Sequence, residues 1–181
     1  ESRDQAYVSR LECVQAAINM QLDELKKKNA QIRVVLITFG SDVTIFGDCS
    51  GAPLILSGDL LNDEQKIVER VSKIDVKTVR ALQHSQNDIA KTVCGLAADG
   101  QTSFGPALVA ATALASSESR AQVVLCTDGV ANVGVGAVDE SCDGLKGRKM
   151  RHRVKDFYKR IAEKAKLSST SVSLTAIEGG D

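Results

Sequence analysis

Strand-like and helix-like segments alternate along this chain, and that alternation restricts the possible folds more than any other feature. Three short apolar runs, at 32–40, 122–127 and 171–177, are rich in β-branched residues and are typical of strands. In the stretches between and before them, apolar residues recur every three or four positions, which is the period of a helix. Ser9 and Glu12 are spaced as a capping box at the start of the first such stretch. The helical stretches are 7–25, 62–74, 79–96, part of 99–117, and 147–167.

This order predicts a single α/β domain over residues 1–181. Strands that alternate with helices form a doubly wound, mostly parallel sheet with helices on both faces. One segment departs from this pattern, because "SDVTIFGDCSGAPLIL" at 41–56 reads as turn, strand, turn, strand and predicts one antiparallel edge strand. Aromatic residues make up only 3% of the 181 residues, so the core must be aliphatic, as is usual for sheets covered on both faces.

Charge and cysteine content exclude several classes of protein. The net charge is zero, which argues against nucleic acid as a partner, and no apolar run is long enough to span a membrane. The chain has five cysteines without close Cys-x-x-Cys spacing, which disfavours a disulfide framework and a zinc cluster. Buried or surface thiols in a reducing compartment are the simpler interpretation, so we expect an intracellular, cytoplasmic protein. An extracellular location is the alternative.

Two oxygen-bearing side chains are predicted at one rim of the sheet. Asp128 follows the strand 122–127, and Thr102 lies in the loop before a helix. Ligands of doubly wound sheets bind beyond the carboxyl ends of the strands, and right-handed crossovers would put both residues on that side. Carboxylate and hydroxyl oxygens suit Mg²⁺ or Mn²⁺. The alternative is that Asp128 caps a turn and Thr102 caps a helix.

Two motifs resemble the von Willebrand factor A domain. "GQTSFGPAL" is similar to the threonine loop of that family, in which Ala-Leu follows the threonine at five and six residues, here Thr102, Ala107 and Leu108. "VVLCTDGVANVG" looks like the family's strand that ends in Thr-Asp-Gly, with Asp128 at the metal-site aspartate. Within the superfamily, "SDVTIFGDCS" and "DFYKRIAEKAKL" resemble the A domain of circularly permutated Ras-like proteins, which are intracellular multidomain proteins related to the trunk of vesicle-coat proteins.

The resemblance implies a metal-ion-dependent adhesion site. In such a site, Thr102 would coordinate Mg²⁺ directly or through water and Asp128 through water, and an open position would accept an exposed Asp or Glu of a protein partner. Gln101, Ser103 and Asn132 would form the partner-binding rim. The family also requires an Asp-x-Ser-x-Ser loop, which does not occur in this sequence. The cofactor is therefore expected only if that loop lies outside this chain.

The same comparison predicts a domain that is incomplete at both ends. The family's first strand carries the missing loop and lies at the centre of the sheet, between the strands here at 33–39 and 122–127. Without it, two buried strands would each have an unpaired edge, at a cost of about 1–3 kcal/mol per unsatisfied buried group. We expect an upstream segment or a second chain to supply it, and a last helix and strand to be absent. "DCSGA" at 48–52 is interpreted as a turn.

The resulting functional hypothesis is a Mg²⁺-dependent protein recognition module that is not an enzyme. No pairing of carboxylates, Cys and His, or Ser and His points to catalysis. The alternative is a metal-independent scaffold within a multidomain intracellular protein, like the vesicle-coat trunk. Two other features are given simpler interpretations: the basic stretch 146–160 as a solvated helix face, and "DGQTSFG" as a loop that lacks the Gly-Lys-Ser/Thr ending of phosphate loops.

Overall fold

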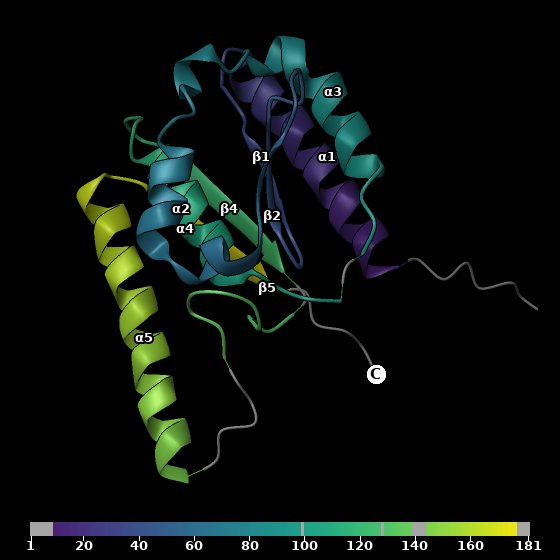
Figure 1. Cartoon of the computed structure of the whole chain (residues 1–181). Coiled ribbons are helices and arrows are strands. Elements are labelled where there is room, and N and C mark those ends of the chain that lie inside the picture. The colour runs from purple at the N-terminus through teal and green to yellow at the C-terminus, as the bar shows by residue number, and fades with distance from the viewer. Residues whose placement is uncertain (1–8, 99, 128, 139–143, 177–181) are drawn as a thin grey trace, which may run out of the picture.

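The computed structural model describes residues 9–98, 100–127, 129–138 and 144–176. The helices in this part of the chain are α1 (Arg10–Lys28), α2 (Glu64–Val71), α3 (Leu82–Cys94), α4 (Phe104–Ala115) and α5 (Gly144–Leu167). The strands are β1 (Leu36–Phe39), β2 (Val43–Gly47), β3 (Leu54–Leu56), β4 (Gln122–Thr127) and β5 (Ser171–Ala176). Two short 3₁₀ turns, Gly58–Asn62 and Val76–Thr78, flank α2. Figure 1 shows their arrangement.

Side-chain caps fix where two of the helices begin. The Ser9 backbone N–H donates to the Glu12 carboxylate (2.6 Å), and the Glu12 N–H donates to the Ser9 hydroxyl (3.2 Å). This is the capping box that the sequence predicted, and it satisfies backbone donors that have no partner within the helix. At the start of α2, the Asp63 carboxylate accepts hydrogen bonds from the N–H groups of Gln65 and Lys66.

The strands form two separate sheets, so the expected single sheet is wrong. β1, β2 and β3 form an antiparallel sheet in that order, and the hairpin expected at 41–56 is part of it. β4 and β5 form a parallel pair, the only parallel pairing among the described strands. The doubly wound, mostly parallel arrangement fails because β1 and β4 are not paired with each other and no described strand bridges them.

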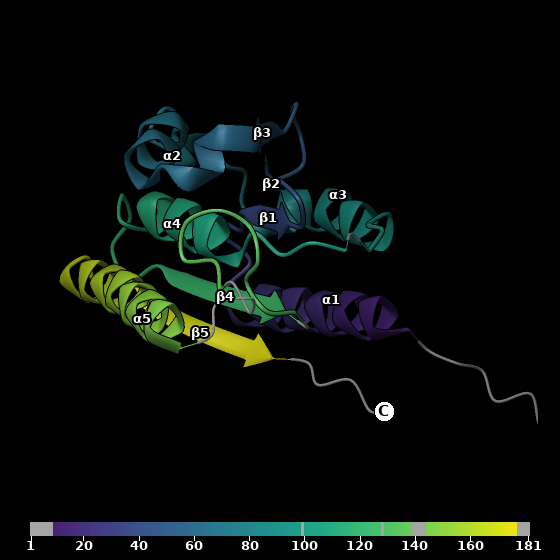
Figure 2. The ribbon, with the colours of Figure 1, turned by 60° about the horizontal axis from the view of Figure 1, so that its bottom comes forward.

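Helices cover both sides of the strands. In Figure 2, α2, α4 and α5 lie to the left of the strands, and α1 and α3 lie to the right. α4 contacts both β1 and β4, so it joins the two sheets. Its residues 105–110 are all buried. The main core therefore contains residues of both sheets as well as of α2, α4 and α5, including Val43, Ile45, Leu56, Ile67, Val109, Val123, Leu125, Phe157 and Ile161.

A second, smaller core lies between α1 and α3. Its buried members are Leu22, Leu82, Ile89 and Val93. Leu22 is the one buried residue of α1, and Ile18 and Leu25 are only half-buried although their helical spacing puts them on the same face as Leu22. The apolar stripe of α1 is therefore only partly covered by the described chain.

The cysteines of the described chain are half-buried or exposed. The described cysteines are all free thiols. Cys126 of β4 is half-buried, and burial raises the pKa of its thiol. Cys13 and Cys94 are exposed. Cys142 lies outside the described residues. No helix in the described ranges is both long enough and apolar enough to cross a bilayer.

Candidate functional site

The loop before α4 and the loop after β4 meet at the carboxyl end of β4. The Thr102 N–H donates to the Asn132 side-chain oxygen (2.7 Å), and the Asn132 N–H donates back to the Thr102 carbonyl (3.1 Å). The Thr102 hydroxyl lies beside Gly129, where an added Cβ would come within 2.6 Å of Oγ1. Thr102 and the segment next to Asp128 are thus brought together, while Asp128 itself lies outside the described residues.

The other predicted rim residues differ in how far they are available. Gln101 and Asn132 are exposed, so both can reach a ligand at the rim. Ser103 is fully buried: its N–H donates to the Gly40 carbonyl (2.9 Å) and its hydroxyl to the Asp42 carbonyl (3.2 Å). Ser103 therefore ties the start of α4 to the turn between β1 and β2 and does not present its hydroxyl to the rim.

Close backbone contacts hold the loop 129–138 against the helices. An added Cβ on Gly105 of α4 would lie 1.8 Å from the Val135 carbonyl oxygen, so only glycine fits there. The Val135 N–H donates to the Leu61 carbonyl (2.8 Å), and the Tyr158 hydroxyl donates to the Gly136 carbonyl (3.1 Å). Burial raises the pKa of Tyr158 to about 12, so it stays a neutral donor. These contacts position Asn132 at the rim.

The described part of the rim does not make a magnesium site by itself. Mg²⁺ takes six oxygen ligands in near-octahedral geometry, usually with one or two carboxylates. The described residues here supply hydroxyl, carbonyl and amide oxygens, and no group of three His, Cys, Asp or Glu side chains suited to a metal occurs among the described residues. Ligation of Mg²⁺ by Thr102 and Asp128 stays a prediction.

A second polar cluster lies at the other end of the hairpin, and the sequence did not reveal it. Asp48 is 6% exposed, and its carboxylate accepts from the Ser50 N–H (3.0 Å) and hydroxyl (2.6 Å) and from the Arg80 N–H and Nε (2.8 Å each). Burial acts to raise the Asp48 pKa, but the hydrogen bonds from Ser50 and Arg80 outweigh it and hold the pKa well below its usual range. Arg80 also pairs with Asp88 of α3. Both carboxylate oxygens of Asp48 already accept hydrogen bonds, and Arg80 donates to Asp48 and to Asp88. The cluster therefore holds the hairpin against α3, and Asp48 is not available as a base. The sequence at 48–50 predicts the turn, but it does not indicate that Asp48 pairs with Arg80, which lies 32 residues later in the chain.

Comparison with known proteins finds a curated relative that matches nearly the whole chain. No family model matches the chain. Circularly permutated Ras protein 1 of Dictyostelium discoideum is 31% identical over 176 residues, which is 96% of this chain and 20% of the relative. The chain therefore spans about one fifth of the length of the curated relative it matches.

This relative corrects several expectations. The assignment to the von Willebrand factor A family is wrong, because no family model supports it and the relative is named as a Ras protein. The expected Mg²⁺-dependent adhesion function is therefore wrong as well, and the relative does not support the alternative of a metal-independent scaffold. The same relative contradicts the expectation that the protein is not an enzyme, because it is named as a Ras protein. Mg²⁺ itself remains compatible with a Ras-like relative, because P-loop GTPases hold their nucleotide with Mg²⁺.

Proposed function

We propose that this chain is one part of a Ras-like, intracellular GTPase and that its own role is to accept an extended segment of that protein between β1 and β4. The relative supports the first half of this proposal. The 181 residues contain no Gly-x-x-x-x-Gly-Lys-Ser/Thr phosphate loop, so the residues that bind nucleotide would belong to other parts of the protein.

The observation that carries the second half is the position of α4. This helix packs against both β1 and β4, so it spans the two sheets. In the described chain, however, β1 pairs only with β2, and β4 pairs only with β5. Each strand therefore has one edge whose N–H and C=O groups have no strand partner among the described residues. A strand inserted there would satisfy both edges.

Partial burial of the neighbouring apolar residues supports the same role. All four residues of β1 are only half-buried, although the run 32–40 has the composition of a strand buried on both faces. On β4, Val124 is 42% exposed. The inward stripe of α1 is half-buried as well, apart from Leu22. The accepted segment should therefore be apolar on both of its faces.

The segment could belong to the same protein or to a second chain, and we favour the same protein. A tethered strand is present at a high effective concentration, whereas a separate chain pays the full entropy of association. The length of the relative leaves ample sequence for such a segment, because this chain covers only a fifth of it.

Hydrogen exchange tests this proposal directly. The 181-residue chain is compared with the intact protein that carries it. Amide groups on the open edges of β1 and β4 should exchange quickly in the chain alone and slowly in the intact protein. β2 is the internal control, because it is already paired on both sides. Equal exchange at β1 and β4 in the two samples would rule out the inserted strand.

The GTPase half is tested separately, so that either half can fail alone. The intact protein should hydrolyse GTP, and removal of Mg²⁺ with a chelator should abolish the activity.

The finer expectation, that Thr102 and Asp128 bind Mg²⁺ at the rim, is tested by calorimetric titration of the intact protein and of its variants Thr102→Ala and Asp128→Ala. Unchanged Mg²⁺ binding in both variants would refute the rim site without affecting the GTPase proposal.

A further inference from the structure

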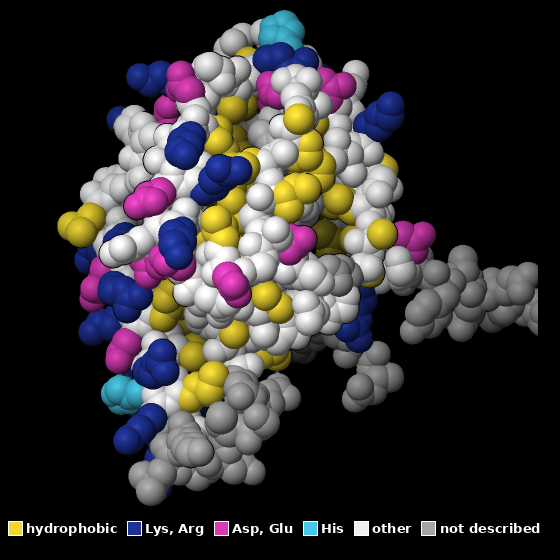
Figure 3. Space-filling model, in the orientation of Figure 1, with side chains coloured by type: hydrophobic (Ala, Val, Ile, Leu, Met, Phe, Trp, Pro, Cys, Tyr) yellow, Lys and Arg dark blue, Asp and Glu magenta, His cyan; other side chains and the backbone are white. Residues whose placement is uncertain are grey.

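α5 carries a straight line of basic residues along its outermost side. Arg148, Lys155, Lys159 and Lys166 are separated by seven, four and seven residues, so they fall within about 40° of one another around the helix. All four are exposed, and at 1.5 Å per residue the line is about 27 Å long. Figure 3 shows dark-blue Lys and Arg side chains following α5 down the left of the molecule. We call these four residues the basic ridge.

The basic ridge has no evident role in holding the fold. The buried side of α5 consists of Phe157, Ile161 and Ala165, which face the core. Two basic residues beside the ridge, Arg160 and Lys164, pair with Glu64 of α2. By contrast, none of the four ridge residues makes an ion pair or hydrogen bond through its side chain within the part of the chain that the structure describes. Four positive charges thus lie close together, and Asp156 and Glu163, the acidic residues on the described part of this helix, form no ion pair with them.

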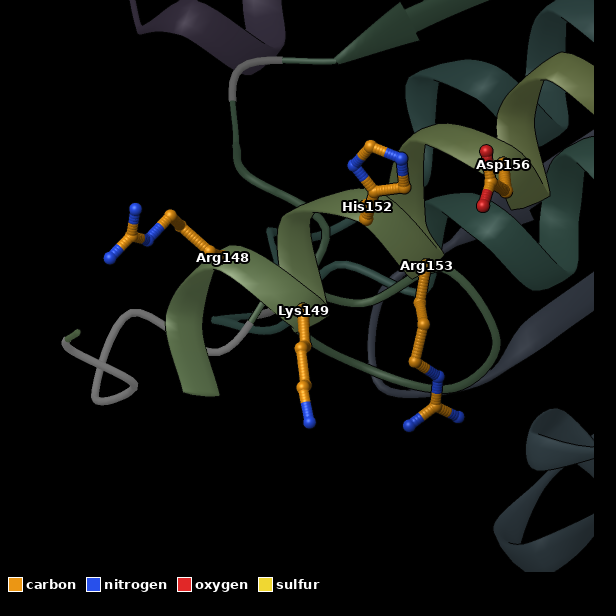
Figure 4. A pocket seen from close by; sticks show the side chains of 5 residues that line it. All are labelled: Arg148, Lys149, His152, Arg153 and Asp156. Carbon is orange, nitrogen blue, oxygen red and sulfur yellow. The ribbon is translucent and has the colours of Figure 1, made fainter. Parts of the chain in front are cut away.

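The shape of this surface favours a flat partner over a small anion. The depression beside the ridge is lined by Arg148, Lys149, His152, Arg153 and Asp156. Figure 4 shows Lys149 and Arg153 pointing the same way, Arg148 pointing to another side, and His152 on the opposite side of the helix. They do not converge on a point where a phosphate could be enclosed. A convex line of charges can instead make all its contacts at once with a plane.

From the charge, the length and the convex shape, we propose that the basic ridge binds the surface of a lipid bilayer that contains anionic headgroups. Groups of four to eight Lys and Arg on a helix are typical of such surfaces, and each residue contributes about a fivefold change in affinity. A lipid surface is favoured over nucleic acid by Leu167, which ends α5, is 87% exposed and lies about 100° around the helix from Lys166, beside the basic ridge and not on it. A leucine can enter the headgroup region of a bilayer, whereas a phosphate backbone offers it no apolar contact.

Vesicle sedimentation tests this proposal. The 181-residue chain should bind vesicles of phosphatidylcholine with phosphatidylserine, and it should not bind vesicles of phosphatidylcholine alone. Binding should disappear in about 1 M salt, where the screening length falls to about 3 Å. The variant R148Q/K155Q/K159Q/K166Q should bind at least about tenfold more weakly. Circular dichroism checks that this variant keeps its helices.

A matched variant removes the same number of charges elsewhere. Lys27, Lys73, Lys77 and Lys91 are exposed and lie off α5, so K27Q/K73Q/K77Q/K91Q should bind nearly as well as the unchanged chain. An equal loss of vesicle binding in both variants would show that net charge alone explains the binding, and it would overturn the proposal. Failure of the unchanged chain to bind anionic vesicles would also overturn it. Tighter binding to duplex DNA than to vesicles, lost in the ridge variant, would replace the bilayer with nucleic acid as the partner.

Discussion

At the scale of single residues, Asp48 is the buried charge with the most partners. Replacing it by asparagine keeps its size but removes the charge that Arg80 faces, so we expect Asp48→Asn to lower the free energy of unfolding by about 2 kcal/mol. The pKa of Asp48 is lower in the folded than in the unfolded chain, where it is near 3.9. Its contribution is therefore complete above about pH 5 and is lost as the pH falls below about 4. Urea unfolding from pH 7 to pH 3 measures both effects.

The control for this prediction is Asp59→Asn, because Asp59 is exposed. This variant should unfold like the unchanged chain at pH 7 and lose stability in acid to the same extent. If Asp48→Asn shows the same acid sensitivity as the unchanged chain, Asp48 is not the group whose ionisation stabilises the hairpin.

Gly105 is the residue on which the position of the rim loop depends most directly. An alanine there would place Cβ 1.8 Å from the Val135 carbonyl oxygen, so the loop 129–138 must move. We expect Gly105→Ala to cost more than about 2 kcal/mol and to separate Asn132 from Thr102. Gly95→Ala is the control, because its nearest contact would be an ordinary 3.5 Å. Urea unfolding measures the loss in the free energy of unfolding, and the NMR chemical shifts of the Thr102 and Asn132 amides report whether the two residues separate. A Gly105→Ala variant with unchanged stability and unchanged shifts would contradict this prediction.

At the scale of whole elements, β4 offers a test of the inserted strand through Val124. Lysine at this position should change stability by less than about 0.5 kcal/mol in the 181-residue chain, because Val124 is already 42% exposed. In the intact protein, the inserted strand would cover it, and the buried ammonium should cost about 1–3 kcal/mol. Val68→Lys on α2, 37% exposed, should behave alike in both. Thermal unfolding measures the difference, and equal effects of Val124→Lys in the two proteins would contradict the insertion.

Local elements were largely predictable from the sequence, and their pairing was not. The capping box of α1, the hairpin at 41–56 and the extent of α5 depend on side chains close in sequence, so periodicity and cap chemistry were sufficient. Sheet order depends on which strands are available as neighbours. β1 and β4 both have strand-like sequences, but nothing in either run specifies that they remain unpaired in this chain.

The candidate site was predictable to a similar degree. Thr102 and the loop after β4 were expected on one rim because of crossover handedness, and the hydrogen bonds between Thr102 and Asn132 place them together. The burial of Ser103 was not foreseen, since its partners Gly40 and Asp42 lie some sixty residues earlier in the chain. Contacts over such separations leave no periodic signal in a single sequence.

At the scale of the whole molecule, the source of the inserted strand determines how stability depends on concentration. A strand tethered within the same protein makes unfolding of the intact protein unimolecular, so its melting temperature should stay constant from about 1 to 100 μM. A strand donated by a second copy would make the melting temperature rise with concentration, because dilution favours dissociation. The 181-residue chain serves as the comparison. We expect it to melt at a lower temperature than the intact protein and to have a smaller urea m-value per residue, because the open edges of β1 and β4 leave less surface buried. If the melting temperature of the intact protein rises with concentration, the inserted strand comes from a second copy and not from the same chain.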